Sequence, residues 1–171
     1  MIHQATKFLS ELLRSDAVGL RVVFESAADH QAHRTPPYAA IIIDQDERYR
    51  RVERKVQFED RPEQNRRVYT YEVIRATLPV SVILVERNRE QLEELRRKFL
   101  AALPATMVDA QGGEVRITPV TGELLEDQSH KRGGVAIDII VEFDAGIYRT
   151  EEVPLFTAVE IEGIDIERPQ D

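Results

Sequence analysis

A single β-like stretch constrains the fold of this chain most. Residues Val68–Val85 keep the composition and alternation of a β-strand for 18 residues, and at ~3.3 Å per residue a straight strand of that length spans roughly 60 Å, more than a small domain. Pro79 cannot donate a hydrogen bond to a neighbouring strand, so we expect a bend or a split there, at an edge or a bulge. We expect the inner end of this strand to pack in the core and its outer end to project from the body of the domain. The residues expected on the inward face are Ile74, Ala76, Leu78, Val80, Val82 and Leu84.

The segment before this stretch supplies a partner for its outer end. Asp46–Arg67 carries eight basic and six acidic side chains, a net charge of +2 in a chain whose net charge is −8. Apolar residues alternate with charged ones there, and Glu59–Asn65 has the composition of a turn. This predicts a β-hairpin arm with two largely polar faces, over about residues 46–71. Such a hairpin buries too little to be stable alone, so it must lie on its own chain or on a neighbouring one.

Two amphipathic helices are expected beside the sheet. Apolar residues recur at spacings of three and four over residues 2–13 and again over residues 92–103, which places each set on one stripe. The first helix ends before Gly19. The second begins after Asn88, which can cap it, with Gln91 at the capping-box position and Pro104 past its end. The ion pairs expected at i,i+4 spacing on this helix are Glu93 with Arg97 and Glu94 with Lys98.

The remaining strands are short. Leu20–Glu25 and Tyr38–Asp44 have the composition of buried strands, and Pro119 interrupts a strand within Gly112–Gly122. Val135–Phe143 alternates strictly, which predicts a half-buried antiparallel strand, and the Asp144–Gly146 turn then makes residues 135–152 a closing hairpin. In residues 158–167 the apolar alternation slips by one at Gly163, which indicates a bulge or turn.

These elements predict one α+β domain over residues 1–171. The expected fold is a mixed, mainly antiparallel sheet backed by two amphipathic helices, with a long projecting charged β-hairpin.

Motifs for catalysis or metal binding are not found. The chain has no cysteine, which excludes disulfides, thiol nucleophiles and Cys-ligated metals. His30 and His33 follow Asp29 in a loop but lack the spacing of a third ligand, so we expect exposed histidines rather than a metal site. Residues 131–134, Lys-Arg-Gly-Gly, precede a strand and so do not form a phosphate-binding loop. The carboxylate pairs Glu151 with Glu152 and Asp138 with Glu142 fall on exposed strand faces.

The expectation is therefore a protein without catalytic residues, metal or cofactor. The first residues lack the basic and apolar regions of a signal peptide, and no apolar run approaches the ~20 residues of a membrane span, so we expect no membrane partner.

The basic residues of the arm are the candidate functional residues, as an electrostatic contact surface. Interleaved acids and a pI near 5.1 weaken the case for nucleic acid as the partner. Residues 151–171 carry seven acidic and one basic side chain, so a head-to-tail contact between one copy's arm and another copy's acidic segment is the favoured hypothesis. The alternative is a solvated hairpin with internal salt bridges. The candidate interface residues are Arg50, Arg51, Arg54, Lys55, Arg61, Arg66 and Arg67.

The order of elements resembles the bacteriophage tail terminator, or tail completion, proteins. It runs from a helix and a strand pair ending in YAAIIID to the charged hairpin and RRVYTYEVIRATLPVSVILVERN, then the helix REQLEELRRKFLAALP and the closing segment GGVAIDIIVEFDAGIYRTEE. The resemblance covers roughly residues 2–152 and is one of layout, since the family has no short signature motif.

The resemblance implies a non-enzymatic virion protein, assembled in the host cytoplasm and located at the tail or neck. Six copies would form a ring that caps the tail tube, stops tail polymerisation and offers a surface for joining the head. Its partners would be further copies of itself, the tail tube protein, the sheath of a contractile tail and the head–tail connector proteins, with DNA passing non-specifically through the ring. Two alternatives stay open: another head–tail connector or neck protein, and a small α+β enzyme or ligand-binding protein with a carboxylate site.

Overall fold

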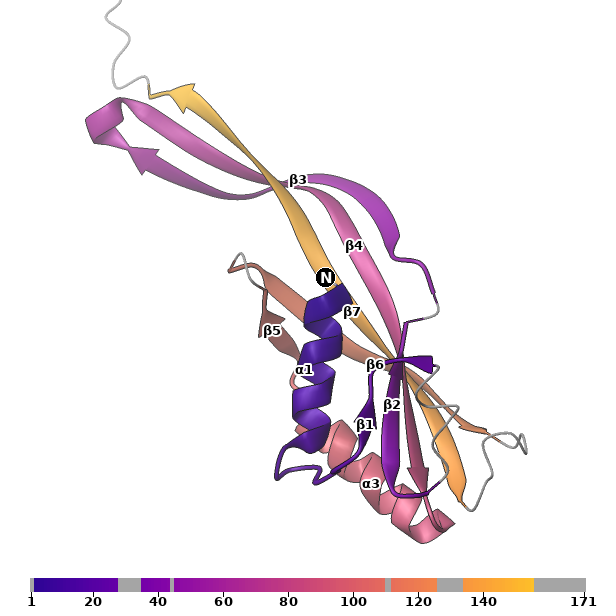
Figure 1. Ribbon diagram of the computed structural model, residues 1–171. Helices are drawn as coiled ribbons and strands as arrows, with labels where there is room; N and C mark the ends of the chain where they lie inside the picture. The colour runs from indigo at the N-terminus through magenta and orange to yellow at the C-terminus, as the bar shows by residue number, and fades with distance from the viewer. Residues whose placement is uncertain (1, 28–34, 44, 110–111, 126–133, 156–171) are drawn as a thin grey trace, which may run out of the picture.

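The computed structural model describes residues 2–27, 35–43, 45–109, 112–125 and 134–155. They form a seven-stranded, mainly antiparallel sheet, and two α-helices lie beside the main body of the sheet (Figure 1). The predicted α+β class is therefore confirmed, including the long arm that projects beyond the helices.

The helices are α1 (Ile2–Arg14) and α3 (Arg89–Ala102), and a 3-10 turn, η1, covers Pro62–Gln64. The strands are β1 (Val23–Phe24), β2 (Tyr38–Ile42), β3 (Arg48–Arg61), β4 (Arg66–Glu86), β5 (Thr106–Val108), β6 (Glu114–Leu125) and β7 (Val135–Pro154). Their order in the sheet is β1-β2-β4-β7-β6-β5, and β3 pairs with β4 on the same side as β2. Only the β1–β2 pairing is parallel among the described strands.

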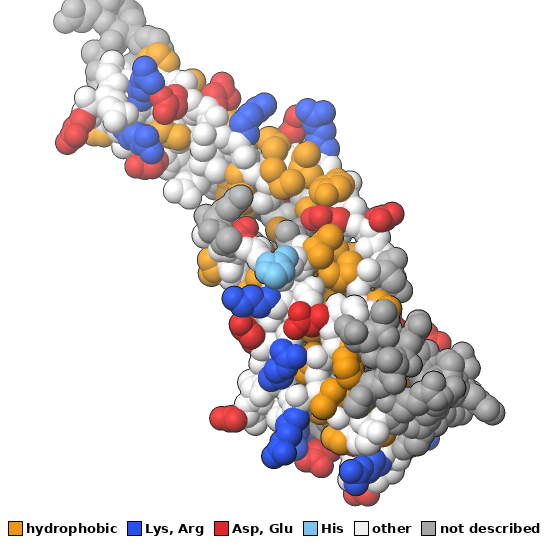
Figure 2. Space-filling view, viewed as in Figure 1, with side chains coloured by type: hydrophobic (Ala, Val, Ile, Leu, Met, Phe, Trp, Pro, Cys, Tyr) orange, Lys and Arg blue, Asp and Glu red, His pale blue; other side chains and the backbone are white. Residues whose placement is uncertain are grey.

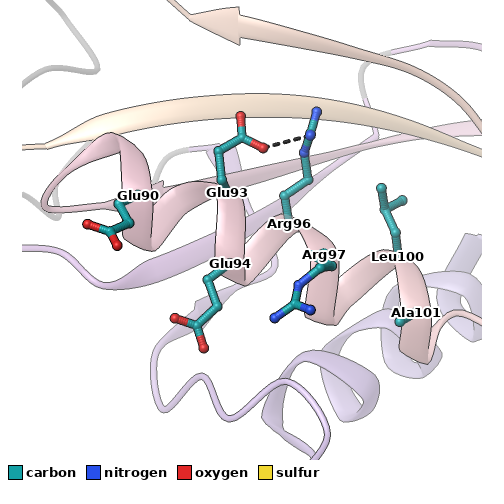
Figure 3. A pocket seen from close by; sticks show the side chains of 7 residues that line it. All are labelled: Glu90, Glu93, Glu94, Arg96, Arg97, Leu100 and Ala101. Carbon is teal, nitrogen blue, oxygen red and sulfur yellow. Dashed lines mark ion pairs between the residues drawn. The ribbon is translucent and has the colours of Figure 1, made fainter.

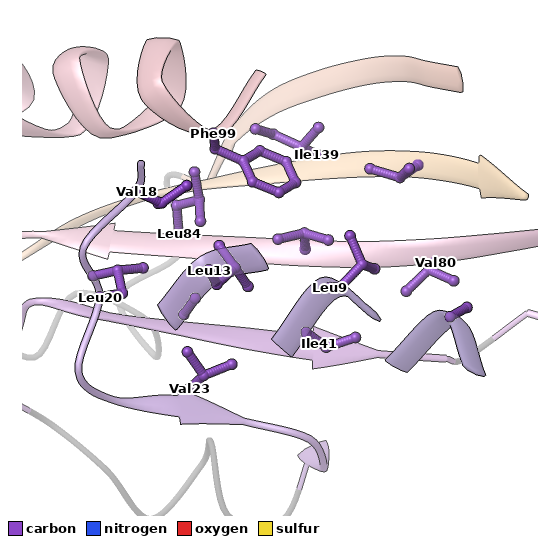
Figure 4. Packing of buried hydrophobic residues seen from close by; sticks show 14 of the residues in the cluster. Leu9, Leu13, Val18, Leu20, Val23, Ile41, Val80, Leu84, Phe99 and Ile139 are labelled. Atoms are coloured by element: carbon purple, nitrogen blue, oxygen red, sulfur yellow. The ribbon is translucent and has the colours of Figure 1, made fainter. Parts of the chain in front are cut away.

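The core lies between the helices and one face of the sheet (Figure 4). Each helix buries one stripe, as the spacing of its apolar residues predicts. The amide of Gln91 donates to Asn88 Oδ1 at 2.9 Å, which confirms the predicted cap of α3. The helix residues in this core include Leu9, Leu13, Leu92, Leu95 and Phe99, and the strand residues include Leu78, Val80, Val82, Leu84, Ile137, Ile139, Val141 and Phe143.

The predicted split of the long strand at Pro79 is wrong, but the predicted position of this proline at a sheet edge is confirmed. β4 runs through this residue as one strand of 21 residues. Pairing with β3 ends at Thr77 and pairing with β2 begins at Ser81, so between them β4 has no ladder partner on that side within the described chain. A proline without an N–H is therefore tolerated in mid-strand, because the sheet edge is open locally there.

The predicted turn at Asp144–Gly146, and with it the closing hairpin, is also wrong. β7 is one strand of 20 residues and pairs with β4 from Val135 to Pro154. Asp144 and Ala145 pair with β4 on one side and with β6 on the other. Pairing on both sides holds this segment extended against its local turn composition.

Other differences are smaller. Glu93 pairs with Arg96 rather than Arg97, whereas the expected Glu94–Lys98 pair forms at 2.8 Å. β6 continues past Pro119 to Leu125, with a shift of register between Pro119 and Thr121. Neither helix of the described chain has both the length and the apolar character needed to cross a membrane.

Several predictions fall outside the described residues. They concern the loop with Asp29, His30 and His33, residues 131–133 of the Lys-Arg-Gly-Gly segment, and the slip at Gly163.

Candidate assembly surface on the arm

The arm consists of β3, η1 and the outer parts of β4 (residues 66–75) and β7 (residues 146–154). The sequence predicts two strands here, and β7 adds a third along the other side of β4. Pairing of β6 with β7 ends at Ala145, so the sheet narrows to three strands beyond that point. At ~3.3 Å per residue the outer part of β4 extends roughly 30 Å past the body.

The arm joins the body at an elbow, where the three strands differ in length. Ile74 and Glu72 of β4 are consecutive paired positions, and one unpaired residue lies between them. Their partners in β7 are adjacent in the sequence, whereas their partners in β3 are separated by two unpaired residues. The extra residues are Val73 in β4 and Val52 and Glu53 in β3, and Glu53 has a φ of 48°. Bulges of this kind increase twist and bend the bulged strand, so the elbow sets the direction of the arm.

The bulge at Val73 also decides which residues share a face. β7 is regular, so Phe143 in the core and Ile147, Arg149 and Glu151 in the arm lie on one side. Their partners in β4 are Leu78, Ile74, Tyr71 and Tyr69. The core face of the sheet therefore continues onto the arm. We call this side of the arm the aromatic face; its apolar residues are Tyr49, Phe58, Tyr69, Tyr71, Ile74, Ile147 and Val153.

Side chains on the aromatic face contact one another along the arm. The ring centroids of Phe58 and Tyr69 lie 6.3 Å apart, and those of Tyr69 and Tyr71 lie 6.2 Å apart. Lys55 Nζ lies 3.7 Å from the centroid of Tyr69, and the guanidinium of Arg149 lies 5.8 Å from that of Tyr71. Hydrophobic side chains are visible along the arm beyond the end of α1, interspersed with charged ones (Figure 2).

The opposite side, the polar face, is built around Glu72. This side chain is 1% exposed and its two carboxylate oxygens have different partners. Arg54 of β3 donates from Nε to Oε2 at 2.7 Å, and Arg75 of β4 donates from Nε to Oε1 at 2.8 Å. Because Arg75 and Glu72 flank the bulge at Val73 while Arg54 follows the one in β3, this cluster joins both bulges of the elbow.

The arginines keep Glu72 ionised. Burial acts to raise the pKa of its carboxyl, but hydrogen bonds from Arg75 and Arg54 outweigh burial and hold the pKa below its ordinary value. A buried acid with a lowered pKa is poorly suited to general acid catalysis, so this cluster has the character of a structural joint.

The seven candidate cations are divided between the two faces. Arg50, Arg54, Arg61 and Arg66 lie on the polar face, and Arg51, Lys55 and Arg67 lie on the aromatic face. Most of the guanidinium groups bind acids of their own chain: Arg51 binds Glu53, Arg54 binds Glu72, Arg61 binds Glu59, Arg66 binds Glu152 and Arg67 binds Asp60. Arg50 forms no ion pair within the described residues. The structure therefore does not bring the seven together into one basic patch.

The ion pair at the tip changes the pKa values of both partners. The hydrogen bond with Arg67 lowers the pKa of Asp60, and the same contact raises the pKa of Arg67. Both side chains lie at the surface of the arm, where such a pair contributes little to stability.

Two hollows on the described surface are lined mainly by charged side chains, one on α3 and one beside the arm, where Glu142 and Asp144 lie with Arg48, Arg50 and Arg75. The first is lined by α3 alone, where Glu93 pairs with Arg96 at 2.6 Å (Figure 3). Glu94 on the same helix pairs with Lys98, which lowers the pKa of that carboxyl. Within the described residues there is no group of three or more His, Asp or Glu side chains that could hold a metal ion.

Comparison with known proteins gives no relative from which a role could be transferred. No protein-family model matches the chain, and no curated protein matches it significantly.

Sequence reasoning missed Glu72 and the aromatic face. Tyr69 and Tyr71 were visible as alternating residues, but the bulge at Val73 changes the phase of that alternation, and only the pairing with β7 reveals it. The sequence does contain one sign of the bulge. At residues 72–75, Glu-Val-Ile-Arg, two adjacent apolar residues interrupt the alternation of apolar and polar residues.

Proposed function

We propose that this chain is a non-enzymatic structural protein of a phage virion that self-associates through its arm and acts as a tail terminator. Six copies would form a ring on the end of the tail tube, stop its polymerisation and provide the surface to which the head joins. This role rests on the layout of the chain, which resembles that family.

One observation carries the proposal: a three-stranded arm that leaves the body with apolar side chains exposed. Phe58 is 57% exposed and Tyr49 is 64% exposed, although both lie on the side of the sheet that forms the core further in. Exposed apolar surface that continues a core face supports a contact with another molecule. A single-layer arm buries too little to serve as an independent binding domain, so a partner that packs against it is the simplest source of stability.

Self-association is tested by measuring the mass of the purified protein. Light scattering after size exclusion is expected to show either a ring of six 19.6 kDa chains, about 118 kDa, or a monomer that forms rings only when tail tubes are added. Negative-stain images of the protein with and without tubes distinguish these two results.

The role in tail assembly is tested in the phage that encodes the chain. Removing the protein is expected to give tails of uncontrolled length, because nothing then stops tube polymerisation. Tails of normal length that fail to join heads would instead indicate another connector of the neck. Binding of the purified protein to empty heads but not to tail ends would point the same way.

A further inference from the structure

The aromatic face of the arm has the chemistry of a peptide-binding surface. Phe58 is 57% exposed and Ile147 is 45% exposed, while the rings of Tyr69 and Tyr71 are half-buried. No helix or strand of the described chain lies over these rings, whereas α1 and α3 cover the same side of the sheet in the body. An apolar ligand of extended shape would bury this surface.

Two cations on this face lack an acidic partner within the described chain. Lys55 and Arg149 lie over the rings of Tyr69 and Tyr71, and neither forms an ion pair with a described residue. Arg51 and Arg67, on the same face, are each already paired with an acid. The face therefore offers rings and two available positive charges against one exposed carboxylate, that of Glu151, which suits a ligand that carries both apolar and acidic side chains.

The chain contains a segment of that composition. Residues 156–171 carry five acidic side chains and one basic one, a net charge of −4. Four β-branched residues are interspersed with the acids: Val159, Ile161, Ile164 and Ile166. Alternation of apolar and acidic residues lets an extended segment place apolar side chains on rings and carboxylates beside cations.

The direction of the chain at the end of β7 favours binding of this acidic segment to the arm of another copy over binding to its own arm. The amide of Leu155 donates to the carbonyl of Asn65 at 2.9 Å, so the chain passes the tip still in the direction of β7. Residues 156–158, Phe-Thr-Ala, contain none of the Gly, Pro, Asn or Asp residues that favour a reversal, and Gly163 is the first of these after Leu155. The eight residues from Leu155 to Gly163 are long enough to span up to roughly 26 Å, which suffices to reach a second copy.

We propose that the aromatic face of the arm binds the acidic segment, residues 156–171, of a second copy of this chain. The inference rests on the proposed self-association and identifies the surface and the segment that make the contact. The proposed contact does not include Arg50, Arg54, Arg61 and Arg66, because these residues lie on the polar face.

The absence of cysteine from the chain allows a direct test by disulfide cross-linking. One protein carries Glu151→Cys on the aromatic face, and a second, tagged to differ in mass, carries Ile161→Cys. The matched control replaces the first by Thr150→Cys, an exposed neighbour on the opposite face of β7. Unfolding curves equal to that of the parent protein establish that both arm variants fold.

The expected result is a two-chain product from Glu151→Cys with Ile161→Cys at least tenfold more abundant than from the control mixture. Equal yields from the two mixtures would overturn the assignment to the aromatic face. A single chain carrying both Glu151→Cys and Ile161→Cys that closes on itself independently of protein concentration would show that the segment binds its own arm, and would overturn the exchange between copies.

The mass of the parent protein separates failure of this inference from failure of the proposed function. If the protein assembles into hexameric rings but the cross-link does not form, the proposed contact is wrong and self-association is still supported. A chain that stays monomeric at every concentration, with and without tubes, and gives no cross-link contradicts both.

Discussion

Arg54 Nε, on β3, lies 2.7 Å from the Oε2 atom of Glu72, on β4, although the two residues are 18 apart in the sequence. The other carboxylate oxygen of Glu72 binds Arg75. This contact crosses the elbow at the point where both strands carry extra residues, so one buried carboxylate ties the two bulged strands together there.

Glu72→Gln is expected to destabilise the protein by about 2 kcal/mol, because it leaves two arginines without their anion at a buried site. The loss is smaller than for a fully enclosed pair, since the Arg54 side chain is 61% exposed and can be solvated. Urea unfolding of purified protein measures the change.

Glu59→Gln is the matched control for this substitution. Glu59 lies on the same arm and pairs with Arg61 at 3.5 Å, but both side chains are largely exposed. We expect a change in unfolding free energy within about 0.5 kcal/mol. An equal loss from the two variants would contradict the role assigned to Glu72.

Stability should decrease in acid because of Glu72. Its pKa is lower in the folded protein than in the unfolded chain, so its contribution is fully present above the unfolded pKa and is lost as the pH falls through the folded pKa. Unfolding free energy measured from pH 7 downward should begin to fall near pH 5. The Glu72→Gln variant should show a shallower fall, with the remaining slope due to groups such as Asp60 and Glu94, whose pKa values are also lowered.

Charge reversal separates structural arginines from those available for assembly. Arg54→Glu places a carboxylate beside the buried Glu72, so it should cost about 2 kcal/mol or more in unfolding free energy. Arg50→Glu should change stability by less than about 0.5 kcal/mol, because Arg50 is exposed and forms no ion pair within the described residues. Thermal unfolding of each variant measures this difference.

A combined reversal of Arg50, Arg51 and Arg54 is consequently a poor test of assembly. We expect it to unfold more easily than the parent protein, because it includes Arg54. The double variant Arg50→Glu with Arg51→Glu is the comparison. If it still self-associates and the triple variant does not, the loss is due to disruption of the Arg54–Glu72 pair at the elbow and not to a contact surface.

The elements with strong local periodicity could be predicted from the sequence. The stripes of α1 and α3, the cap at Asn88 and the alternation of Val135–Phe143 are properties of neighbouring residues, and each is present in the structure. The projecting arm was also predictable, because a β-like stretch of such length could not fit within a small domain.

The errors arose where pairing between distant strands overrides local composition. Asp144–Gly146 has turn composition but is held straight by β4 and β6, and Pro79 lies where β4 has no partner on one side within the described chain. The buried position of Glu72 depends on a bulge and on arginines from two strands, which a local pattern does not show.

Gly146 gives a last test of the strand that replaced the predicted turn. A Cβ atom built on Gly146 would lie 2.5 Å from Cζ and Oη of Tyr148, whose ring therefore lies over the glycine on the polar face. The atoms met are the far end of a half-exposed side chain that can move aside, and Gly146 does not have a positive φ, so Gly146→Ala should cost no more than about 0.5 kcal/mol. In a Tyr148→Ala background the same substitution should be neutral or slightly stabilising, because alanine restricts the unfolded chain.

The difference between the two backgrounds, measured by urea unfolding as a double-mutant cycle, should therefore be no more than about 0.5 kcal/mol. Gly122→Ala is the control, since its added Cβ would meet Ile137 Cδ1 at 3.6 Å, an ordinary contact. If Gly146 lay in a tight turn, as its local sequence suggests, the cost of Gly146→Ala would come from the backbone and would persist when Tyr148 is removed. A cost of about 1 kcal/mol or more in both backgrounds would thus contradict the continuous β7 strand.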